Sequence, residues 1–489
     1  MIFQGKKMNR KNIIKWFVCI CLSACLLVTV IVADYFNTKH SPDTEQVTMT
    51  GRKHQKNFKW TKPDIEYLDY YGIGNFETDL PVLHINTDHQ QIHKERKIWA
   101  SLSVMESAGD GKTRSIMETP DWESAITLNY RGASSYSMFD KKQYRIKFYK
   151  EKGSTNSKKY DFLGMGRNCE WVLNGPFLDK TLLRNRLVYG LGRQIFQWAS
   201  DCRYVELFLD GEYQGVYLAV EPVTNGESRL RLCEFGLLSG ETAYIVKRDR
   251  VDTEDNPINV YGQYAGKTNN SLYIDYPTKN HLTEKQRQWI TRDIDHFERV
   301  LYSDNFADPA YGYAKYIDVD NFVDYVVLNE VVMNRDAGNL STYIYKELGG
   351  KLQIAIWDYN NCFDNYQWFP QDYEQFYLQD VAWFSVLLKD RTFVDQVVHR
   401  YRELRKDILS DECLYEQIDS YVEELGGAID RNYAIWGYSF FEKLVVDENE
   451  LHTNPASYEE AVEQLKKSMH ARLSFMDSHI TKLYENCIN

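Results

Sequence analysis

Two aspartates, Asp336 and Asp358, flank a segment whose sequence is typical of two short strands joined by a turn. Residues 341–346 contain the Thr, Tyr and Ile typical of a strand, and the glycine pair at 349–350 is a turn signal before the second strand. A hairpin of this kind returns both carboxylates to the same side. One carboxylate can then hold a divalent cation against a nucleoside triphosphate while the other accepts a hydroxyl proton.

The same order of elements places the catalytic and the metal-binding aspartate in protein kinases. An ordinary hairpin with exposed aspartates in its turns has the same pattern, because two aspartates about 20 residues apart are a weak signal. Two neighbouring carboxylates also repel each other unless a cation lies between them. The two aspartates alone therefore leave both interpretations open.

The segments around the hairpin are predicted to position it. Residues 320–333 are apolar nearly all round, which predicts a buried helix before Asp336. A second helix is expected over residues 179–198, with Asp179 as its cap and a stripe of leucines. Alternating apolar and polar residues predict strands at Val82–Ile85, Trp99–Met105, Ala125–Tyr130 and Tyr144–Tyr149, and a hairpin over 205–220 that turns at Asp210-Gly211.

Candidate phosphate ligands lie among these strands. The turn from Arg131 to Ser135 lacks a glycine-rich loop, so its backbone amides, Ser134 and Arg131 would have to hold phosphate oxygens. Lys147 shares one strand face with Arg145 by the two-residue period. An unliganded turn and a lysine that faces solvent fit the same sequence, so these residues also leave two interpretations open.

Several stretches, in the same order, resemble the CotH family of spore-coat kinases. They are Arg131-Gly132-x-Ser134-Ser135, Lys142-x-x-Tyr144-Arg145-Ile146-Lys147-Phe148, Trp171-Val172-Leu173-Asn174, Asp179-x-Thr181-x-x-Arg184-Asn185, Val205 to Tyr217, and Glu330-x-x-x-Asn334-x-Asp336 through Trp357-Asp358. The resemblance runs across most of the chain from about Leu80. It implies an α+β, atypical protein-kinase-like fold with two lobes, a β-rich amino-terminal lobe and a helical carboxyl-terminal lobe.

The resemblance also implies ATP and Mg²⁺ or Mn²⁺ as cofactors and a role for each candidate residue. Asp336 would be the catalytic base or would orient the acceptor hydroxyl. The other implied residues are the metal positions Asp358, Asn339, Ser341 and Asn360, and the ATP-binding positions Lys147, Arg131, Ser134 and Glu221. Glu221 falls where a kinase hinge offers its backbone to adenine.

Two features depart from the pattern of the family and of ordinary kinases. Asn360 stands where many relatives have a second aspartate, although Asp364 would restore that charge if it pointed inward. No glutamate between residues 179 and 198 can pair with the lysine, and Glu206 is the candidate replacement. These departures favour a second hypothesis, a catalytically inactive kinase-shaped surface module that binds a partner or a glycan.

The amino-terminal part of the chain predicts an extracytoplasmic protein. A basic tail, residues 1–15, precedes an uncharged apolar segment, residues 16–33, and a polar stalk follows over 34–75. A single-pass anchor with a cytoplasmic amino terminus fits this order. A cleaved signal peptide and a lipoprotein anchored at Cys25 are the alternatives, and all three place the body outside the cytoplasm.

The composition of the 489 residues limits the function further. The net charge of −12 argues against nucleic acid as a partner. The six cysteines after residue 33 contain no C-x-x-C pair, so no zinc site is expected. We expect a β-rich amino-terminal lobe over 76–223, a catalytic lobe over 224–370 and its helical remainder over 371–489. The predicted reaction transfers the γ-phosphoryl of ATP to Ser or Thr of an envelope or spore-coat protein.

Overall fold

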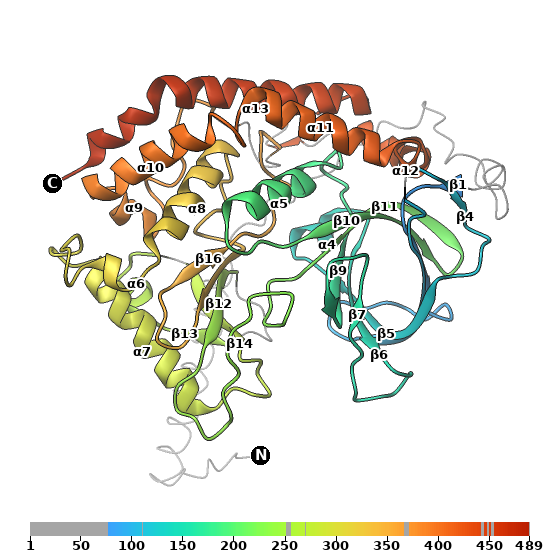
Figure 1. Ribbon diagram of the computed structural model, residues 1–489, viewed down its shortest axis with the longest axis horizontal. Coiled ribbons are helices and arrows are strands. Elements are labelled where there is room, and N and C mark those ends of the chain that lie inside the picture. Colours follow the sequence, from blue (N-terminus) through green and yellow to red (C-terminus); the bar gives the residue numbers. More distant parts are fainter. Residues whose placement is uncertain are drawn as a thin grey trace, which may run out of the picture. The chain divides into compact units, whose positions relative to one another are not determined.

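The computed structural model describes residues 77–109, 111–250, 256–268, 270–365, 371–441, 445–446, 449–450 and 454–488. The predicted basic tail, membrane segment and stalk, residues 1–75, lie outside this part of the chain. Among the described residues no helix is both long and apolar enough to cross a bilayer. All of these residues belong to one compact unit, which contains helices and sheets (Figure 1). The predicted α+β class is therefore confirmed.

Seven strands form a closed barrel in the order β10-β11-β9-β6-β5-β3-β2, closed by the parallel pairing of β2 with β10. They are β2 (Val82–Asn86), β3 (Ile98–Met105), β5 (Trp122–Arg131), β6 (Gln143–Tyr149), β9 (Glu170–Asn174), β10 (Cys202–Leu209) and β11 (Glu212–Val220). Their alternating pattern places one set of side chains inside the barrel, where Ile146, Phe148 and Trp171 are fully buried. The predicted strands and the turn at Asp210-Gly211, whose two residues both have positive φ, are confirmed.

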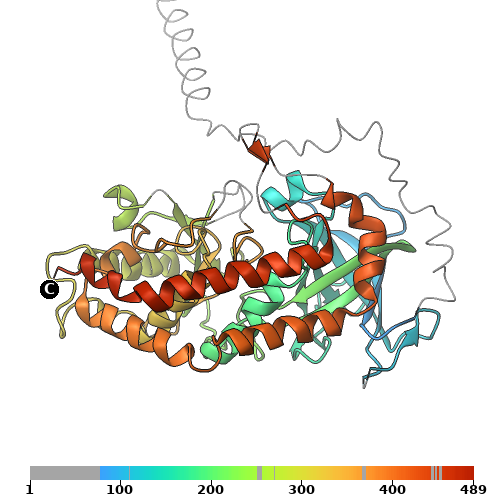
Figure 2. The ribbon, with the colours of Figure 1, turned by 90° about the horizontal axis from the view of Figure 1, so that it is seen from above.

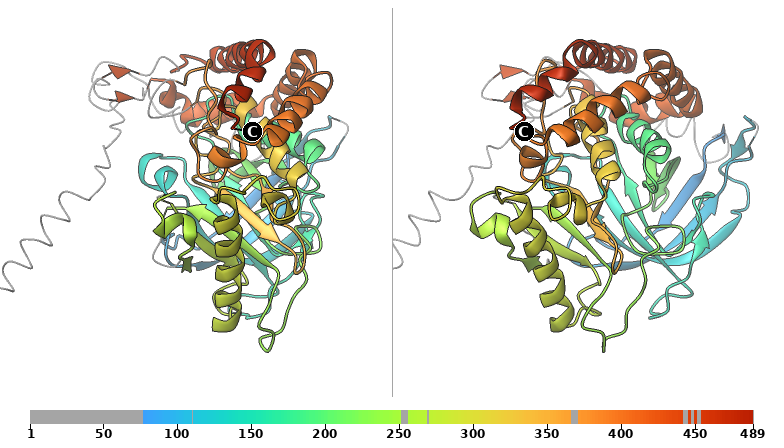
Figure 3. Two further views of the ribbon diagram at one scale, coloured as in Figure 1. Left: turned by 90° about the vertical axis from the view of Figure 1, so that its left-hand side faces the viewer. Right: turned by 60° about the vertical axis from the view of Figure 1, so that its left-hand side comes forward.

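A five-stranded sheet has the order β13-β14-β12-β15-β16. Its strands are β12 (Tyr244–Asp249), β13 (Pro257–Ile258), β14 (Ser271–Tyr276), β15 (Thr342–Lys346) and β16 (Gln353–Ala355). Helices α7 (Glu284–Leu301) and α8 (Val319–Val331) pack on one face, as Figure 3 shows for α7. Lys346 binds Asp293 of α7, and Tyr325 of α8 contacts Thr342. The opposite face carries Lys247, which pairs with Tyr343 of β15.

The remaining helices lie along both β regions in Figure 1. The longer ones are α5 (Arg184–Ile195), α10 (Arg391–Leu404), α11 (Asp411–Leu425), α12 (Ala428–Trp436) and α13 (Tyr458–His479). Helices α11 and α13 run side by side in Figure 2, and Lys466 of α13 binds Asp419 of α11. The short elements are β1 (Glu77–Thr78), β4 (Arg114–Ser115), α4 (Ser134–Met138), β7 (Tyr160–Asp161), β8 (Arg167–Asn168), α6 (Tyr261–Tyr264), α9 (Phe384–Leu387), β17 (Val445–Val446), β18 (Asn449–Glu450) and the 3₁₀ turns Tyr313–Lys315, Gly437–Phe440 and Ile480–Asn486.

Helix α12 packs on the barrel, although the sequence places it in the carboxyl-terminal helical part. Lys141, which is fully buried beneath it, donates to Asn432 Oδ1 at 2.7 Å. The Val216 amide donates to the same oxygen, and Arg431 pairs with the buried Glu206 of β10 at 2.8 Å. Helix α12, from the carboxyl-terminal part of the chain, therefore completes the packing of a barrel that is built from the amino-terminal part.

The helix predicted over residues 179–198 is shorter in the structure and begins at Arg184. Residues 179–183 form a tight turn instead, in which Asp179 accepts the amide and the hydroxyl of Thr181. Asp179 Oδ2 also accepts the Arg184 amide at 2.8 Å. Asp179 therefore accepts a free amide of the first helical turn from five residues upstream of Arg184, and it does not occupy the cap position itself.

Candidate active site

Asp336 and Asp358 lie at the same end of the β15–β16 hairpin. Asp336 belongs to the loop that joins α8 to β15, and Asp358 follows β16 after two residues. The antiparallel register pairs Tyr343 with Ala355, so the start of β15 and the end of β16 are adjacent. The hairpin predicted from the sequence is confirmed.

The two carboxylates share one electrostatic environment. Burial among protein atoms, together with the charges of Asp336 and Asp249 and against the opposing charge of Arg131, raises the pKa of Asp358 to about 6. Burial also raises the pKa of Asp336, against the charge of Arg250. Asp358 is nevertheless exposed to solvent. Protein atoms thus crowd a carboxylate that water and small ions still reach, which is a suitable environment for a cation ligand.

Helix α5 holds the Asp358 backbone in an unusual conformation. The φ angle of Asp358 is +65°, in the left-handed region that non-glycine residues rarely adopt. The Asp358 amide donates to the Tyr189 hydroxyl at 3.2 Å, and the Tyr359 amide donates to Asn185 Oδ1 at 2.7 Å. Both acceptors come from α5. Strained residues that the surrounding structure holds in place cluster at functional sites, and Asp358 fits that description.

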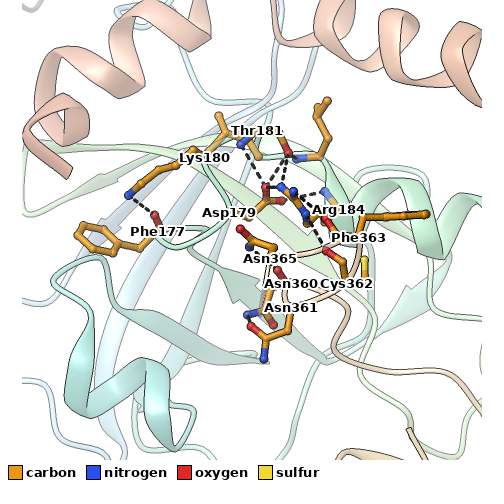
Figure 4. A network of polar contacts seen from close by, with 12 residues as sticks. Phe177, Asp179, Lys180, Thr181, Arg184, Asn360, Asn361, Cys362, Phe363 and Asn365 are labelled. Carbon is orange, nitrogen blue, oxygen red and sulfur yellow. Dashed lines mark hydrogen bonds and ion pairs between the residues drawn. The ribbon is translucent and has the colours of Figure 1, made fainter. Parts of the chain in front are cut away.

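A buried ion pair at the start of α5 secures the loop after Asp358 (Figure 4). Arg184 binds Asp179 at 2.6 Å, with both side chains nearly inaccessible to solvent. The same guanidinium donates to the carbonyl of Cys362 at 2.9 Å and to that of Phe363 at 3.3 Å. The stretch Asp179 to Asn185, which the sequence matched to the family without a role, therefore fixes the loop that carries Asp358.

An asparagine chain joins the two aspartate loops. The Asp336 amide donates to Asn334 Oδ1 at 3.2 Å, and Asn334 donates to Asn329 Oδ1 of α8 at 2.9 Å. The Tyr359 hydroxyl donates to that same Asn329 oxygen at 3.1 Å. The backbone before Asp336 and the residue after Asp358 are thus connected through one buried side chain.

Arg131 and Ser134 lie beside the two aspartates. The Arg131 guanidinium stacks on the ring of Trp357, 5.4 Å from its centroid, and its charge opposes the rise in the Asp358 pKa. Ser134 Oγ accepts a hydrogen bond from Arg250 at 3.2 Å, and the charge of Arg250 acts on Asp336. The structure thus brings together four of the predicted residues from the barrel and from the hairpin.

Lys147 lies on the outer face of the barrel, on the same side of β6 as Arg145. It is paired in register with Glu170 of β9. Burial alone would raise the pKa of Glu170, but the charges of Arg145, Lys147 and Lys97 outweigh burial and lower it. The charges of Glu170 and of Asp275 on β14 both raise the pKa of Arg145. This face of the barrel and the five-stranded sheet therefore share one electrostatic environment.

The predicted metal positions differ in their contacts. Ser341, at φ +48°, forms a hydrogen bond with Asp358 that favours the ionised carboxylate. Asn360 donates to Asn361 Oδ1 at 3.0 Å, and Asn361 reaches Asp336 Oδ2 at 3.5 Å. Asn339 caps the turn after Asp336 through its backbone. Among the described residues no group of three or more His, Cys, Asp or Glu is arranged to hold a metal ion.

Two carboxylates proposed as substitutes have other partners. Glu206 is fully buried and binds Arg431 and the Tyr213 hydroxyl, so the expectation that it pairs with Lys147 is wrong. Asp364 accepts hydrogen bonds from the Gln371 amide and the Tyr373 hydroxyl. Because these contacts hold Asp364 in a buried loop, it does not restore the charge that Asn360 lacks.

Glu221 is buried at the end of β11. Its amide donates to the Asp201 carbonyl at 3.0 Å, and its carboxylate accepts the Asp201 amide and pairs with Arg229 at 3.4 Å. Burial raises the pKa of Glu221 to about 7. The Glu221 amide, one of the backbone groups expected to bind adenine, is therefore already engaged within the protein.

The sequence interpretation missed three charged residues of this region, Glu170, Asp249 and Asp275. Each is a partly exposed acid on a strand whose other residues are mostly buried, and a charged residue within such an apolar strand was the available signal. Asp249 and Asp275 both raise the pKa of Tyr343, together with burial. They bring the exposed face of the five-stranded sheet into the same site.

A mixed α+β chain with paired aspartates at a hairpin end, and with arginine and serine beside them, is consistent with the kinase-like resemblance. The chain matches the family described as CotH kinase protein over residues 128–476 and belongs to the CotH family. It is also 22% identical over 290 residues to the inner spore coat protein H of Bacillus subtilis (strain 168). That similarity covers 58% of this chain and 69% of the relative.

Proposed function

We propose that the protein is a CotH-type protein kinase that transfers the γ-phosphoryl group of ATP to a Ser or Thr hydroxyl of an envelope or spore-coat protein. The observation that supports this best is the meeting of Asp336 and Asp358 at one end of the hairpin beside Arg131 and Ser134. The name of the Bacillus relative supports a coat-associated role. An amino-terminal anchor over residues 16–33 would place the reaction outside the cytoplasm.

In the proposed reaction Asp336 orients the acceptor hydroxyl and accepts its proton. The hydroxyl oxygen forms a bond to the γ-phosphorus while the bond from that phosphorus to the β–γ bridging oxygen breaks, and ADP leaves. Arg131, Lys147 and Ser134 bind phosphate oxygens and hold them in line. The raised pKa of Asp336 brings its basicity closer to neutral pH, which suits proton acceptance.

Magnesium or manganese would be held by Asp358, with the oxygens of Ser341, Asn360 and Asn339 as further ligands. These are hard oxygen donors of the kind both cations prefer, and Asp358 is accessible. Such a cation supplies positive charge to the phosphates. Only one of the four ligands is a carboxylate, so we expect weaker metal affinity than in relatives with two.

A kinase-shaped module without turnover is the second candidate. Its supporting observation is that Asn360 replaces a carboxylate and that Asp364 is engaged by Gln371 and Tyr373. Such a module would bind a partner protein or a glycan at the cell surface. It would keep the support of the hairpin but would lack productive metal binding.

Calorimetric titration of the purified protein with ATP, with and without Mg²⁺, separates the two candidates. Metal-dependent binding that is lost in Asp358→Asn supports the kinase, and a phosphotransfer assay with Asp336→Asn as control then tests turnover. Absence of binding with either Mg²⁺ or Mn²⁺, from protein whose circular dichroism shows it folded, contradicts the kinase and leaves the binding module.

A further inference from the structure

We propose that Glu170, on strand β9, positions Lys147 for the phosphates, in place of the helix glutamate that ordinary kinases use. The proposal rests on the proposed function, because it assigns a role within that nucleotide site. Ordinary kinases pair this strand lysine with a glutamate from a mobile helix. Helix α5 contains no acidic residue, and Glu206 is bound to Arg431. The lysine therefore needs a partner from elsewhere.

The register of the barrel supplies that partner. β6 and β9 are antiparallel neighbours, and Lys147 stands directly opposite Glu170. Ile146 and Trp171, the neighbours of this pair in sequence, are buried inside the barrel, so Lys147 and Glu170 both lie on its outer face. Directly opposed residues on one face have Cβ atoms about 5 Å apart. The lysine can therefore bring its ammonium to this carboxylate by a change of rotamer alone.

Other contacts keep the Glu170 carboxylate in place. Arg145, two residues before Lys147 on the same face, forms an ion pair and a hydrogen bond with Glu170 Oε1. The Glu170 carbonyl accepts a hydrogen bond from the buried Arg229 at 2.8 Å. Arg229 itself stacks on Trp171, 4.8 Å from the ring centroid. Glu170 is thus fixed through its backbone and its side chain.

The Lys147 ammonium forms no hydrogen bond or close ion pair with any residue in the part of the chain that the structure describes. Its ammonium is half-buried and remains able to move toward an anion, while Glu170 balances the charge of Lys147, Arg145 and Lys97. Without that carboxylate, three cations would repel one another on one face. The role assigned to Glu170 is to hold this cationic group together in the absence of nucleotide.

The arrangement divides two tasks that one helix performs in ordinary kinases. In this protein α5 fixes the Asp358 loop through Asn185 and Tyr189, whereas β9 supplies the carboxylate for the lysine. Because β6 and β9 are hydrogen-bonded within a closed barrel, no helix movement separates Lys147 from Glu170. The inferred nucleotide site is therefore assembled permanently and lacks a switch based on a moving helix.

A double-mutant cycle on the full-length protein tests this role. MgATP affinity is measured by calorimetry for wild type, Glu170→Gln, Lys147→Met and the double variant, and thermal unfolding confirms that each is folded. We expect Glu170→Gln to weaken binding roughly tenfold, as residues that interact directly do, and to have no further effect in the Lys147→Met background. Glu123→Gln, a matched change on the outer face of β5, should bind like wild type.

Three outcomes would overturn the proposal. Unchanged affinity in Glu170→Gln shows that the carboxylate has no positioning role. If the losses of MgATP affinity in the two single variants multiply in the double variant, Glu170 acts independently of Lys147. A second cycle with Arg145→Gln would then test whether Arg145 is the partner of Glu170. If wild type itself binds no MgATP, the proposed function fails. This result is distinguishable from the other two because it is obtained with wild type, before any variant is measured.

Discussion

Two ion pairs of the same chemistry serve the candidate site in different surroundings. Asp179 and Arg184 are 3% and 6% exposed and lie beneath the Asp358 loop, whereas Glu170 and Arg145 are 18% and 47% exposed on the outer face of the barrel. Breaking a buried pair leaves an uncompensated charge without water. An exposed pair exchanges its partner for solvent at little cost.

The difference distinguishes an ion pair that supports the fold from an ion pair that adjusts ligand binding. The guanidinium of Arg184 binds a carboxylate and two loop carbonyls, so it determines where Asp358 can be. Arg145 contributes charge to a surface that water reaches, so its main effect should be on the phosphates of the proposed nucleotide. Substitutions of the first pair should therefore change stability, and substitutions of the second pair should change ligand affinity.

The largest effect is expected for Arg184→Met. The change leaves Asp179 buried without its partner and removes the donors to Cys362 and Phe363, so the free energy of unfolding should fall by about 3–5 kcal/mol. Urea denaturation measures this fall. A loss below 1 kcal/mol would show that the loop is held by other contacts and that the comparison of the two pairs is mistaken.

The next largest effect is expected to be a pH dependence of the free energy of unfolding that is caused by Asp358. Its pKa in the folded protein is about 6 against an ordinary value of 3.8, so the folded state binds more protons than the unfolded chain between these values. The free energy of unfolding of the metal-free protein should therefore decrease as pH rises from about 4 to 6, and Asp358→Asn should lack this component. Melting curves of both proteins across this pH range provide the measurement.

The proton on Asp358 would compete with the proposed metal ion. Because a cation requires the ionised carboxylate, MgATP affinity should fall roughly tenfold for each pH unit below 6. Calorimetry at pH 5, 6 and 7 tests the trend. An affinity that is constant over this range would exclude Asp358 as the metal ligand.

A smaller effect is expected for Tyr189→Phe, which keeps the ring and removes the acceptor for the Asp358 amide. The loss should be about 1–2 kcal/mol of unfolding free energy, with a several-fold loss of MgATP affinity because the Asp358 backbone loosens. Tyr401→Phe is the control, since its hydroxyl donates to Asp477 of α13, outside the stretch that supports Asp358. Equal losses of affinity in both variants would contradict a specific role for Tyr189.

The smallest change in stability is expected for Arg145→Gln. The exposed ion pair with Glu170 should contribute at most about 1 kcal/mol to the free energy of unfolding. Its MgATP affinity should nevertheless fall, and more so at low ionic strength, where surface charges are screened least. A stability loss as large as that of Arg184→Met would remove the distinction between the two pairs.

Local patterns located several of the elements, although α5 begins five residues later than predicted. Period-two alternation located β2, β3, β5 and β6. The pattern Thr283-x-x-Gln286 is typical of a helix start, and it forms the capping box of α7. The hairpin that carries Asp336 and Asp358 was predictable because its strands, its glycine turn and its flanking helix are all adjacent in sequence. Each of these features depends on residues that are close together in the sequence.

The partners of charged side chains were not predictable in the same way. Arg184 reaches a carbonyl 178 residues away, and Glu206 binds an arginine 225 residues away. No local pattern encodes which of many acids and bases meet once the chain folds. The sequence therefore proposed Glu206 as the lysine partner and missed Glu170, which only the register between β6 and β9 identifies.

The attachment of α12 to the barrel has a consequence for how the protein is made. Lys141 and Glu206 are buried against Asn432 and Arg431, which follow them by 291 and 225 residues. A chain that leaves the ribosome or crosses a membrane in order must keep both charges hydrated until residue 432 has emerged. We therefore expect the barrel, although it is synthesised early, to complete its packing only after α12 has been synthesised.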